Sequence, residues 1–397
     1  MARQRRSRNE RYTVHNTVHL LQSGEEFFSA LENMICQAQQ EIHLQTYILA
    51  NDETGRRIVQ ALMDASRLRQ VKVYVLVDAY GSQNLPPGFI RDMENAGIGF
   101  RKYGRFYSRG RLHIGRRMHR KVAVADGEVA IVGGINISNH YNDLPGHKAW
   151  LDFAVLVKGA VSKRLHLICR QRWLNIRFQR FSKKMRLPSL SSPNPQTADM
   201  AIRVSQNDFL RRKNQVAITY RQAFRQSTSS ILIVGGYFLP GGQVRRILKN
   251  ASRRGVSISI IVSEKSDVKV AIYARQYLYD WLLRYNIRIY EYLPANVHGK
   301  VLISDNKFIS IGSYDLNNLS TYSNIELNLD INDTNFAAAF THRLEKIIAS
   351  DCRLITKEEF EHRITWRQRI LNWVSYRFAK TFFVLSAWTA GRNEREY

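Results

Sequence analysis

The sequence has few cysteines and no long hydrophobic run. Its three cysteines (Cys36, Cys169 and Cys352) are scattered and form no CxxC pair, which argues against a disulfide framework and against a zinc site. No stretch reaches the roughly 18 uninterrupted apolar residues that a membrane-spanning helix requires. The segment Met1–Tyr12 holds five arginines with no apolar run behind them, unlike a secretory signal. We therefore expect an intracellular protein whose contact with a membrane is peripheral.

Acidic residues are also scarce relative to basic ones. Sixty Lys and Arg against 33 Asp and Glu give a formal net charge of +27, more than solubility requires. This excess predicts a polyanionic partner, namely nucleic acid, an anionic membrane surface or a phosphorylated substrate. The hydrophobic content of 44% excludes a largely disordered chain. A length of 397 residues predicts two domains, because it exceeds what one core usually holds.

The expected secondary structure alternates between helices and strands, and then repeats. Apolar spacing predicts a helix over 27–38 and a strand over 41–49, and the same order recurs with a helix over 215–226 and a strand over 230–234. A further helix is predicted over 270–283. The two halves are offset by about 180 residues, which is typical of a duplicated domain and too long for a solenoid repeat. The predicted fold class is therefore α/β.

Charge, the Pro- and Ser-rich composition of one segment, and the repeat together predict five regions. They are a basic N-terminal tail over 1–16, a first domain over 17–181, a linker over 182–200, a second domain over 201–355, and a basic amphipathic C-terminal segment over 356–397.

Each half carries the same short motif, H-x-K-x4-D. The motif residues are His119, Lys121 and Asp126 in the first half, and His298, Lys300 and Asp305 in the second. Each copy is followed by a strand and a small-residue turn, GGINIS over 133–138 and GSYDLN over 312–317. One such motif is only suggestive. Two copies at equivalent places in duplicated halves argue strongly against chance.

The residue types of the motif suit chemistry on a phosphate. Residues two apart in a strand point to the same face, so each histidine would lie beside its lysine and form a pocket for an anion. Histidine is the side chain whose proton moves most easily near neutral pH, and it serves as a nucleophile or as a general acid and base. Asp126 and Asp305 begin turns, where Asp hydrogen-bonds its own backbone. We therefore expect them to have a structural or supporting role.

These residues resemble the phospholipase D superfamily, whose signature is H-x-K-x4-D, and within it the bacterial cardiolipin synthases of the short, soluble type. The stretches that carry the resemblance are RRMHRKVAVADGEVAIVGGINIS, HGKVLISDNKFISIGSYDLNNLS, LQTYI and GGYFLPG, and it spans roughly residues 18–355. It implies two similar α-β-α sandwich domains that form a pseudo-dimer around one shared active site.

The resemblance also implies a two-step transfer through a phosphohistidine. One histidine attacks the phosphorus, while the other protonates the leaving alcohol and then deprotonates the incoming one. By analogy with the family, we assign the nucleophile to His119 and the acid/base to His298. The two motif lysines would neutralise the nonbridging oxygens, so neither a metal nor another cofactor is implied. Asn136, with Asp315 or Asn317, would add polar contacts.

Family members further place a carboxylate 25 to 35 residues after each motif histidine to orient that ring. Asp152 follows His119 by 33 residues, and Glu326 follows His298 by 28. The alternative for both is a place on a solvated face or in a salt bridge. One departure from the family concerns the turn GSYDLN, where relatives usually have GSxNLD. An acceptor at Asp315 replaces an amide donor, which would weaken anion binding at this position unless Asp315 points away.

The C-terminal segment bears on the substrate. Residues 365–388 place aromatic and aliphatic side chains three and four apart, with arginines and a lysine between them. This is the composition of an interfacial helix on an anionic membrane, although packing of its first two turns against the second domain is an alternative. Because a nuclease has no need of such a helix, it favours lipid over nucleic acid.

The leading hypothesis is a cardiolipin synthase that moves a phosphatidyl group to phosphatidylglycerol. The expected partners are an anionic phospholipid membrane and phospholipid substrates, with phosphatidylglycerol or phosphatidylethanolamine as the donor. Nucleic acid is not expected, no obligate protein partner is evident, and the expected location is the cytoplasmic side of the cell membrane. The alternative is a phospholipase D-type phosphodiesterase that hydrolyses phospholipid or nucleic acid. A catalytically silent binding protein is disfavoured, because both His-Lys pairs are intact.

Overall fold

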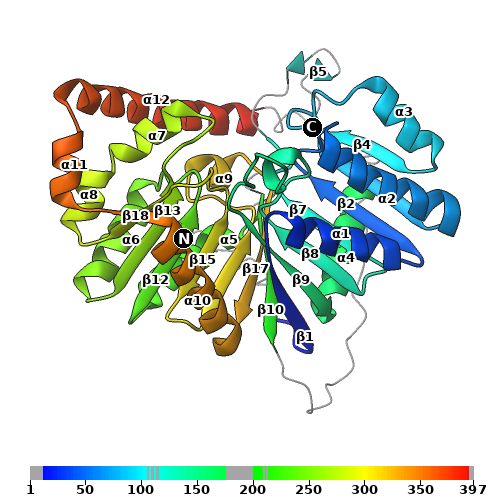
Figure 1. Ribbon diagram of the computed structural model, residues 1–397, viewed down its shortest axis with the longest axis horizontal. Coiled ribbons are helices and arrows are strands. Elements are labelled where there is room, and N and C mark those ends of the chain that lie inside the picture. Colours follow the sequence, from blue (N-terminus) through cyan, green and yellow to red (C-terminus); the bar gives the residue numbers. More distant parts are fainter. Residues whose placement is uncertain are drawn as a thin grey trace, which may run out of the picture.

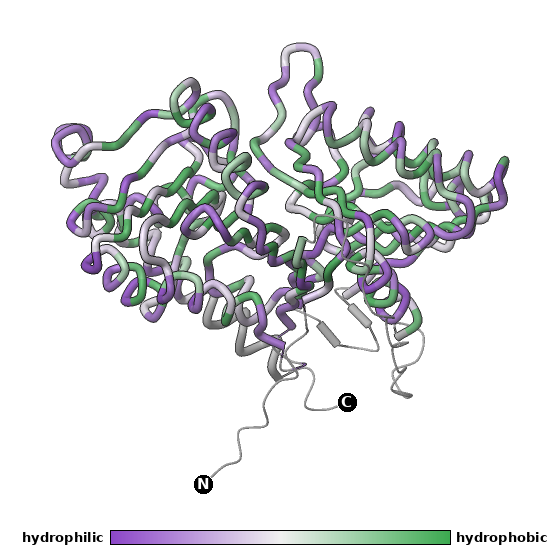
Figure 2. The backbone as a smooth tube through the Cα atoms, turned by 90° about the horizontal axis from the view of Figure 1, so that it is seen from below, coloured by the Kyte–Doolittle hydropathy of each residue, from purple (hydrophilic) through white to green (hydrophobic). Residues whose placement is uncertain are grey.

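The structure consists of two similar halves, each built on one mixed β-sheet (Figure 1). The computed structural model describes residues 12–104, 107–108, 111–112, 116–175, 200–208, 211 and 213–392. Most of the predicted tail and the predicted linker over 182–200 lie outside these residues. Seen from below, the halves form two lobes, and hydrophilic and hydrophobic residues alternate along the outer helices (Figure 2). The predicted α/β fold of the phospholipase D type is confirmed.

The first half contains the elements up to α4. They are β1 (Asn16–Gln22), α1 (Glu25–Gln37), β2 (Glu41–Thr46), α2 (Glu53–Arg69), β3 (Lys72–Asp78), α3 (Pro87–Asn95), β4 (Gly99–Tyr103), β5 (Tyr107–Ser108), β6 (Arg111–Leu112), β7 (Lys121–Ala125), β8 (Val129–Gly133), the 3-10 helix η1 (Asn139–Tyr141), β9 (Phe153–Gly159) and α4 (Ala160–Asn175).

The second half repeats this order and extends it. Its elements are β10 (Ala201–Asp208), β11 (Lys213–Asn214), α5 (Gln215–Gln226), β12 (Ser230–Gly235), α6 (Gly242–Arg253), β13 (Ser257–Ser263), α7 (Lys269–Gln276), α8 (Tyr279–Arg284), β14 (Arg288–Tyr292), β15 (Lys300–Ser304), β16 (Phe308–Gly312), α9 (Asn318–Tyr322), β17 (Glu326–Asn332), α10 (Thr334–Asp351), β18 (Cys352–Ile355), α11 (Lys357–Arg363) and α12 (Trp366–Arg392).

The strand order shows the duplication directly. The first sheet runs β1-β9-β8-β7-β2-β3-β4, and the second contains the matching series β10-β17-β16-β15-β12-β13-β14, with β11 and β18 added at its edges. In both sheets the last three strands of the series are parallel and the others are antiparallel. Each motif therefore occupies the same place in its own sheet, at the start of a central antiparallel strand.

A shared core joins the halves. Buried aliphatic residues of β7, β8 and β9 form one cluster with those of β15, β16 and β17, and α4 and α10 contribute to it as well. Phe153 on β9 meets Phe340 on α10 with ring centroids 5.1 Å apart. Each sheet has a second cluster on its other face, against α1 and α2 in the first half and against α5 and α6 in the second. The sheets thus pack on each other through the strands that lead to and from the motifs.

The prediction of one continuous helix over 270–283 is wrong. The structure divides it into α7 and α8, with Tyr277 and Leu278 between them. The amide of Leu278 donates to the carbonyl of Arg275, three residues back, which tightens the turn and ends α7. This turn buries Leu278 in the core of the second half. Among the described residues, no helix is both long enough and apolar enough to cross a bilayer.

Candidate active site

The two motifs meet where the halves touch. His119 and His298 lie two residues before Lys121 and Lys300, the first residues of β7 and β15, so each precedes its strand rather than lying within it. The amide of His119 donates to the carbonyl of Ile325 at 3.0 Å, and the amide of His298 donates to that of Leu151 at 2.8 Å. Both bonds cross from one half to the other. Each motif histidine is therefore fixed on the backbone of the opposite half.

The carboxylate partners are exchanged between the halves in the same way. Nδ1 of His119 lies 3.1 Å from Oε2 of Glu326, and Nδ1 of His298 lies 2.6 Å from Oδ2 of Asp152. The prediction that each carboxylate orients the histidine of its own half is wrong. The cause is the sheet packing, because Asp152, just before β9, and Glu326, the first residue of β17, lie at the contact between the halves. With Nδ1 engaged, Nε2 is the nitrogen of each ring that remains for a substrate.

The two carboxylates are fully buried but differ in electrostatics. Burial raises the pKa of Asp152 to about 7, against the opposing charges of Lys300 and Lys121. Burial also acts to raise the pKa of Glu326, but the charge of His119 and a hydrogen bond from it prevail and lower the pKa. Ser313 Oγ adds a bond to Oε2 of Glu326 at 2.5 Å. At neutral pH Glu326 is thus the firmly ionised member of the pair.

The two lysines are buried beside the histidines. Burial, and then the charge of Lys300, lower the pKa of Lys121 to about 7. Nζ of Lys121 donates to the carbonyl of His119 at 2.7 Å, and Lys300 bonds the carbonyl of His298 in the same way. Nζ of Lys300 also lies 3.4 Å from Oδ2 of Asp315. The unusual aspartate therefore offsets one of the two cations, and its Oδ1 is buried with no hydrogen-bond partner among the described residues.

Asn136 and Asn317 shape loops around the site. Asn136 donates Nδ2 to Tyr141 Oη at 2.8 Å and accepts from the amide of Ile48 at 3.1 Å. Asn317 begins α9 as its N-cap, accepting from the amide of Ser320 at 2.9 Å. Both amides thus have local partners that fix the backbone next to the histidines.

Asp126 and Asp305 hold turns at the opposite ends of β7 and β15. Asp126 has φ of 54° and its carboxylate accepts from the amides of Gln39, Gln40 and Glu41 at 2.8 Å. Asp305 has φ of 53° and accepts in the same way from the amides of residues 228–230. This geometry is that of a structural role, since neither side chain touches a motif histidine.

Aromatic rings line the site, and the sequence analysis did not single them out. Tyr47 lies edge-on to His119 with centroids 5.0 Å apart, and Tyr141 lies edge-on to His298 at 5.1 Å. Trp150 and Tyr237 are also near His298, at 6.3 and 6.5 Å. Tyr47 directly follows β2, and Tyr237 follows the corresponding strand β12 after one glycine. This repeated position, within LQTYI and GGYFLPG, is the signal that could have identified them.

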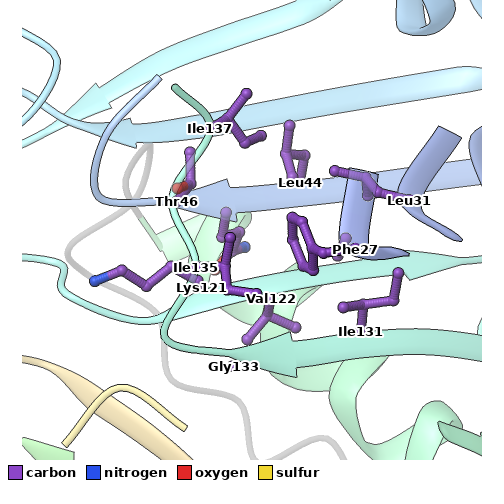
Figure 3. A pocket seen from close by; sticks show the side chains of 12 residues that line it. Phe27, Leu31, Leu44, Thr46, Lys121, Val122, Ile131, Gly133, Ile135 and Ile137 are labelled. Atoms are coloured by element: carbon purple, nitrogen blue, oxygen red, sulfur yellow. The ribbon is translucent and has the colours of Figure 1, made fainter. Parts of the chain in front are cut away.

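A small cavity lies beside this site and has Lys121 among its lining residues. It has a volume of about 20 Å³ and is lined mainly by apolar side chains of the first half, such as Phe27, Leu31 and Ile131. Figure 3 shows the Lys121 side chain pointing away from these residues. The cavity is therefore a packing defect of the core, and the histidines do not face it.

The buried His298 and the partly exposed His119, each with a carboxylate on Nδ1 and a lysine beside it, form the arrangement expected of a phospholipase D-type active site. Comparison with known proteins gives the family. Residues 31–148 and 220–348 match the family described as "Cardiolipin synthase, PLD-like domain", and the chain belongs to this family. The predicted superfamily, and the predicted class of a phosphatidyltransferase enzyme within it, are thereby confirmed.

Individual relatives agree with the family. The chain is 32% identical over 378 residues to cardiolipin synthase B of Salmonella typhi, covering 94% of this chain and 90% of that protein. It is 29% identical over 384 residues to cardiolipin synthase B of Escherichia coli K12, covering 96% and 92%. Its fold is similar to the crystal structure of phosphatidylserine synthase from Haemophilus influenzae Rd KW20, with a TM-score of 0.74, 14% identity, and coverage of 96% and 97%.

Proposed function

We propose that the protein synthesises cardiolipin by transferring a phosphatidyl group to phosphatidylglycerol through a phosphohistidine on His119. The observation that carries this proposal is the exchanged pairing of two histidines with two buried carboxylates, which leaves both Nε2 atoms for one phosphate. Relatives at about 30% identity over nearly the whole chain are named cardiolipin synthase B, which supports the same acceptor chemistry.

In the first step, Nε2 of His119 attacks the phosphorus of the donor phospholipid. A P–N bond forms as the P–O bond to the leaving alcohol breaks, and His298 supplies the proton that this oxygen takes up. Ionised Glu326 accepts the Nδ1–H of His119, which increases the nucleophilicity of Nε2 and stabilises the positive charge that develops on the ring. Lys121 and Lys300 offset the charge on the nonbridging oxygens.

In the second step, a hydroxyl of phosphatidylglycerol gives its proton to Nε2 of His298 and attacks the phosphorus. The P–N bond breaks, cardiolipin leaves and His119 is restored. Burial, and then the charges of Lys300 and Lys121, lower the pKa of His298 well below its usual value. Because Asp152 has its pKa raised to about 7, the closely spaced pair holds one proton between them and can release it to a leaving oxygen. This asymmetry supports His298 as the acid/base and His119 as the nucleophile.

We further propose that α12 holds the protein on the cytoplasmic surface of an anionic membrane. Its small and polar residues Asn372, Ser375 and Ala379 are buried in the protein, and α12 packs closely on α7 and α9 (Figure 1). Its large apolar residues face outward instead, with Trp366 67% and Phe378 61% exposed. Packing and membrane contact therefore use opposite faces of one helix. The side chains of 382–388, which the sequence also assigned to the membrane, lie outside the described residues.

The exposed apolar surface continues from α12 onto its neighbours. The described large hydrophobic residues that are exposed on or next to α7, α9 and α12 are Val268, Val270, Tyr277, Tyr322, Trp366, Ile370, Leu371, Trp373, Val374 and Phe378. Helix α9 begins directly after Asn317 of the active site. Asp267, just before α7, accepts a hydrogen bond from Tyr237 beside His298 at 3.0 Å. A bilayer on this surface would present its lipids close to the histidines, which supports phospholipid rather than nucleic acid as the substrate.

The reaction is tested with the purified full-length protein and vesicles of labelled phosphatidylglycerol, alone and with phosphatidylethanolamine as a second donor. We expect cardiolipin and glycerol from phosphatidylglycerol alone, and His119→Ala and His298→Ala should each abolish turnover. His342→Ala, at an exposed position on α10, is the matched control and should remain active. Release of phosphatidic acid in place of cardiolipin would indicate a hydrolase, and cleavage of a plasmid with inert lipid would refute the proposal.

The nucleophile is identified with a phosphatidyl ester whose leaving group is p-nitrophenolate, which departs without a proton. His298→Ala should then still release one equivalent of p-nitrophenolate and retain a phosphatidyl group on His119, found by mass spectrometry. His119→Ala should release none. The reverse pattern would exchange the two roles.

A further inference from the structure

Three side chains that commonly bind metals converge between β2 and α4, apart from the active site. Glu41 and His43 lie two apart on β2, and His166 reaches them from α4. One ligand atom from each lies within 4.8 Å of the others. Oε1 of Glu41 is 2.5 Å from Nε2 of His43, and the two imidazole centroids are 5.4 Å apart.

Three buried ring nitrogens of the two histidines have no hydrogen-bond partner in the part of the chain that the structure describes. His43 is only 1% exposed, and neither of its ring nitrogens has a hydrogen-bond partner among the described residues. The close approach of Glu41 thus lacks the geometry of an N–H donation. Nδ1 of His166 is likewise buried and without a partner there. Buried polar atoms without a partner are rare in folded proteins, and a bound ion can satisfy such atoms.

The ring of His43 is held in place by a neighbouring aromatic ring. Tyr74 on β3 stacks on it, with centroids 5.0 Å apart and planes 22° from parallel. With its ring held by Tyr74, His43 keeps Nε2 beside Oε1 of Glu41.

We propose that Glu41, His43 and His166 bind a Zn²⁺ ion that fastens α4 to the first sheet. Two imidazole nitrogens and one carboxylate oxygen form a donor set that suits zinc, whereas Mg²⁺ and Ca²⁺ prefer oxygen ligands throughout. Glu41 and His166 are partly exposed, so the ion can enter and a water can complete a tetrahedron. The cysteine spacing that argued against zinc does not bear on this cluster, because none of its ligands is a cysteine.

The ion has a structural role here. Gln45, on the same face of β2 as His43, donates to the carbonyl of Cys169 on α4 at 2.9 Å and also bonds the buried Arg120. Arg120 stands between His119 and Lys121 in the motif. Zinc would therefore strengthen the contact between β2 and α4 that supports this arginine. About 13 Å of strand separates His43 from Tyr47 at the active site, so the transfer reaction itself does not pass through the ion.

The test uses the full-length protein, freed of metal with a chelator and titrated with Zn²⁺ by calorimetry. We expect one ion per chain and a higher unfolding temperature in the presence of zinc, since a ligand that binds only the folded state stabilises it. Co²⁺ should give the visible absorption of a tetrahedral site. His166→Gln and Glu41→Gln should remove the bound ion, the temperature shift and the absorption, whereas His342→Gln on α10 should preserve all three.

Metal-free His166→Gln should unfold at the same temperature as the metal-free wild type, which separates loss of the ion from loss of the fold. Absence of stoichiometric binding in the wild type would overturn the proposal. So would binding that both His166→Gln and Glu41→Gln retain, because the ion would then lie elsewhere on the surface.

Discussion

The exchange of carboxylates between the halves leads to a sharp prediction about one half-reaction. In the His298→Ala background, the p-nitrophenyl donor reports only attack by His119. Glu326→Gln should slow this step, because a neutral amide replaces the carboxylate that holds Nδ1 of His119. Asp152→Asn should leave the step nearly unchanged, because its histidine partner has already been removed.

The expected magnitude follows from the geometry. The contact of 3.1 Å between Nδ1 of His119 and Glu326 is a hydrogen bond to a charged group, and such bonds contribute about 1.5–3 kcal/mol. Since about 1.4 kcal/mol corresponds to a factor of ten in rate, Glu326→Gln should slow p-nitrophenolate release about 10- to 150-fold. Ser313 and Asn324 also bond Glu326, and the glutamine can keep its place through them.

The assay is a single-turnover burst followed by stopped-flow absorbance, with circular dichroism to confirm that each variant is folded. The two double variants are matched, since each carries one neutralised carboxylate in an otherwise identical background. If Asp152→Asn slowed the burst and Glu326→Gln did not, each carboxylate would serve the histidine of its own half, and the exchanged pairing would be refuted.

Three further predictions concern charge, stability and the membrane. Because Lys121 has its pKa lowered to about 7, kcat/KM should fall as the pH rises above about 7 and the lysine loses its proton. Asp315→Asn removes a charge that favours protonated Lys121, so the midpoint of this fall in kcat/KM should move to lower pH. A move of the midpoint to higher pH would contradict the assignment. Burial acts to raise the pKa of Asp305, but backbone amides lower it to about 2. This carboxylate therefore stabilises the fold above about pH 4, and stabilises it less as the pH falls towards 2. Asp305→Asn should flatten that part of the curve of unfolding free energy against pH, and an unchanged slope would exclude this stabilising role of Asp305. Trp373→Ser on α12 should lower the affinity for anionic vesicles, measured by sedimentation, about tenfold, in line with about 1.5–3 kcal/mol for a large buried apolar side chain. Leu68→Ser on α2 should leave this affinity unchanged. Equal effects of the two variants would refute docking through α12.

The sequence predicted which residues meet at the contact between the halves better than how they pair there. The duplicated motif carried the family resemblance that implied the class of enzyme and the pseudo-dimer, and the residue type alone predicted the turn role of Asp126. The partner of each histidine could not be predicted, since Asp152 and Glu326 follow their own motifs at equally suitable distances. Only the packing of β9 and β17 at the contact between the halves decides which ring each carboxylate reaches.

Other features escaped prediction because they depend on tertiary contacts. Apolar periodicity runs unbroken through Tyr277 and Leu278, but burying Leu278 requires a tighter turn there. The aromatic stripe of α12 was recognised, yet periodicity cannot tell an inward from an outward apolar face. Burial of Asn372 and Ser375 against the protein is what turns Trp373 outward. In the cluster of Glu41, His43 and His166, the last residue follows the other two by more than 120 residues, so no local motif joins all three.

Joining the halves in one chain permits a difference that two identical subunits could not have. In a symmetric homodimer any substitution would occur twice, on both sides of the bound phosphate. Here Asp315 accompanies Lys300, while the equivalent position beside Lys121 is Asn136, so the two cations are not equal. A single chain can therefore specialise one histidine for bonding to phosphorus and the other for carrying a proton. By the same reasoning, the halves expressed as separate polypeptides should be inactive singly and recover activity only when they reassociate.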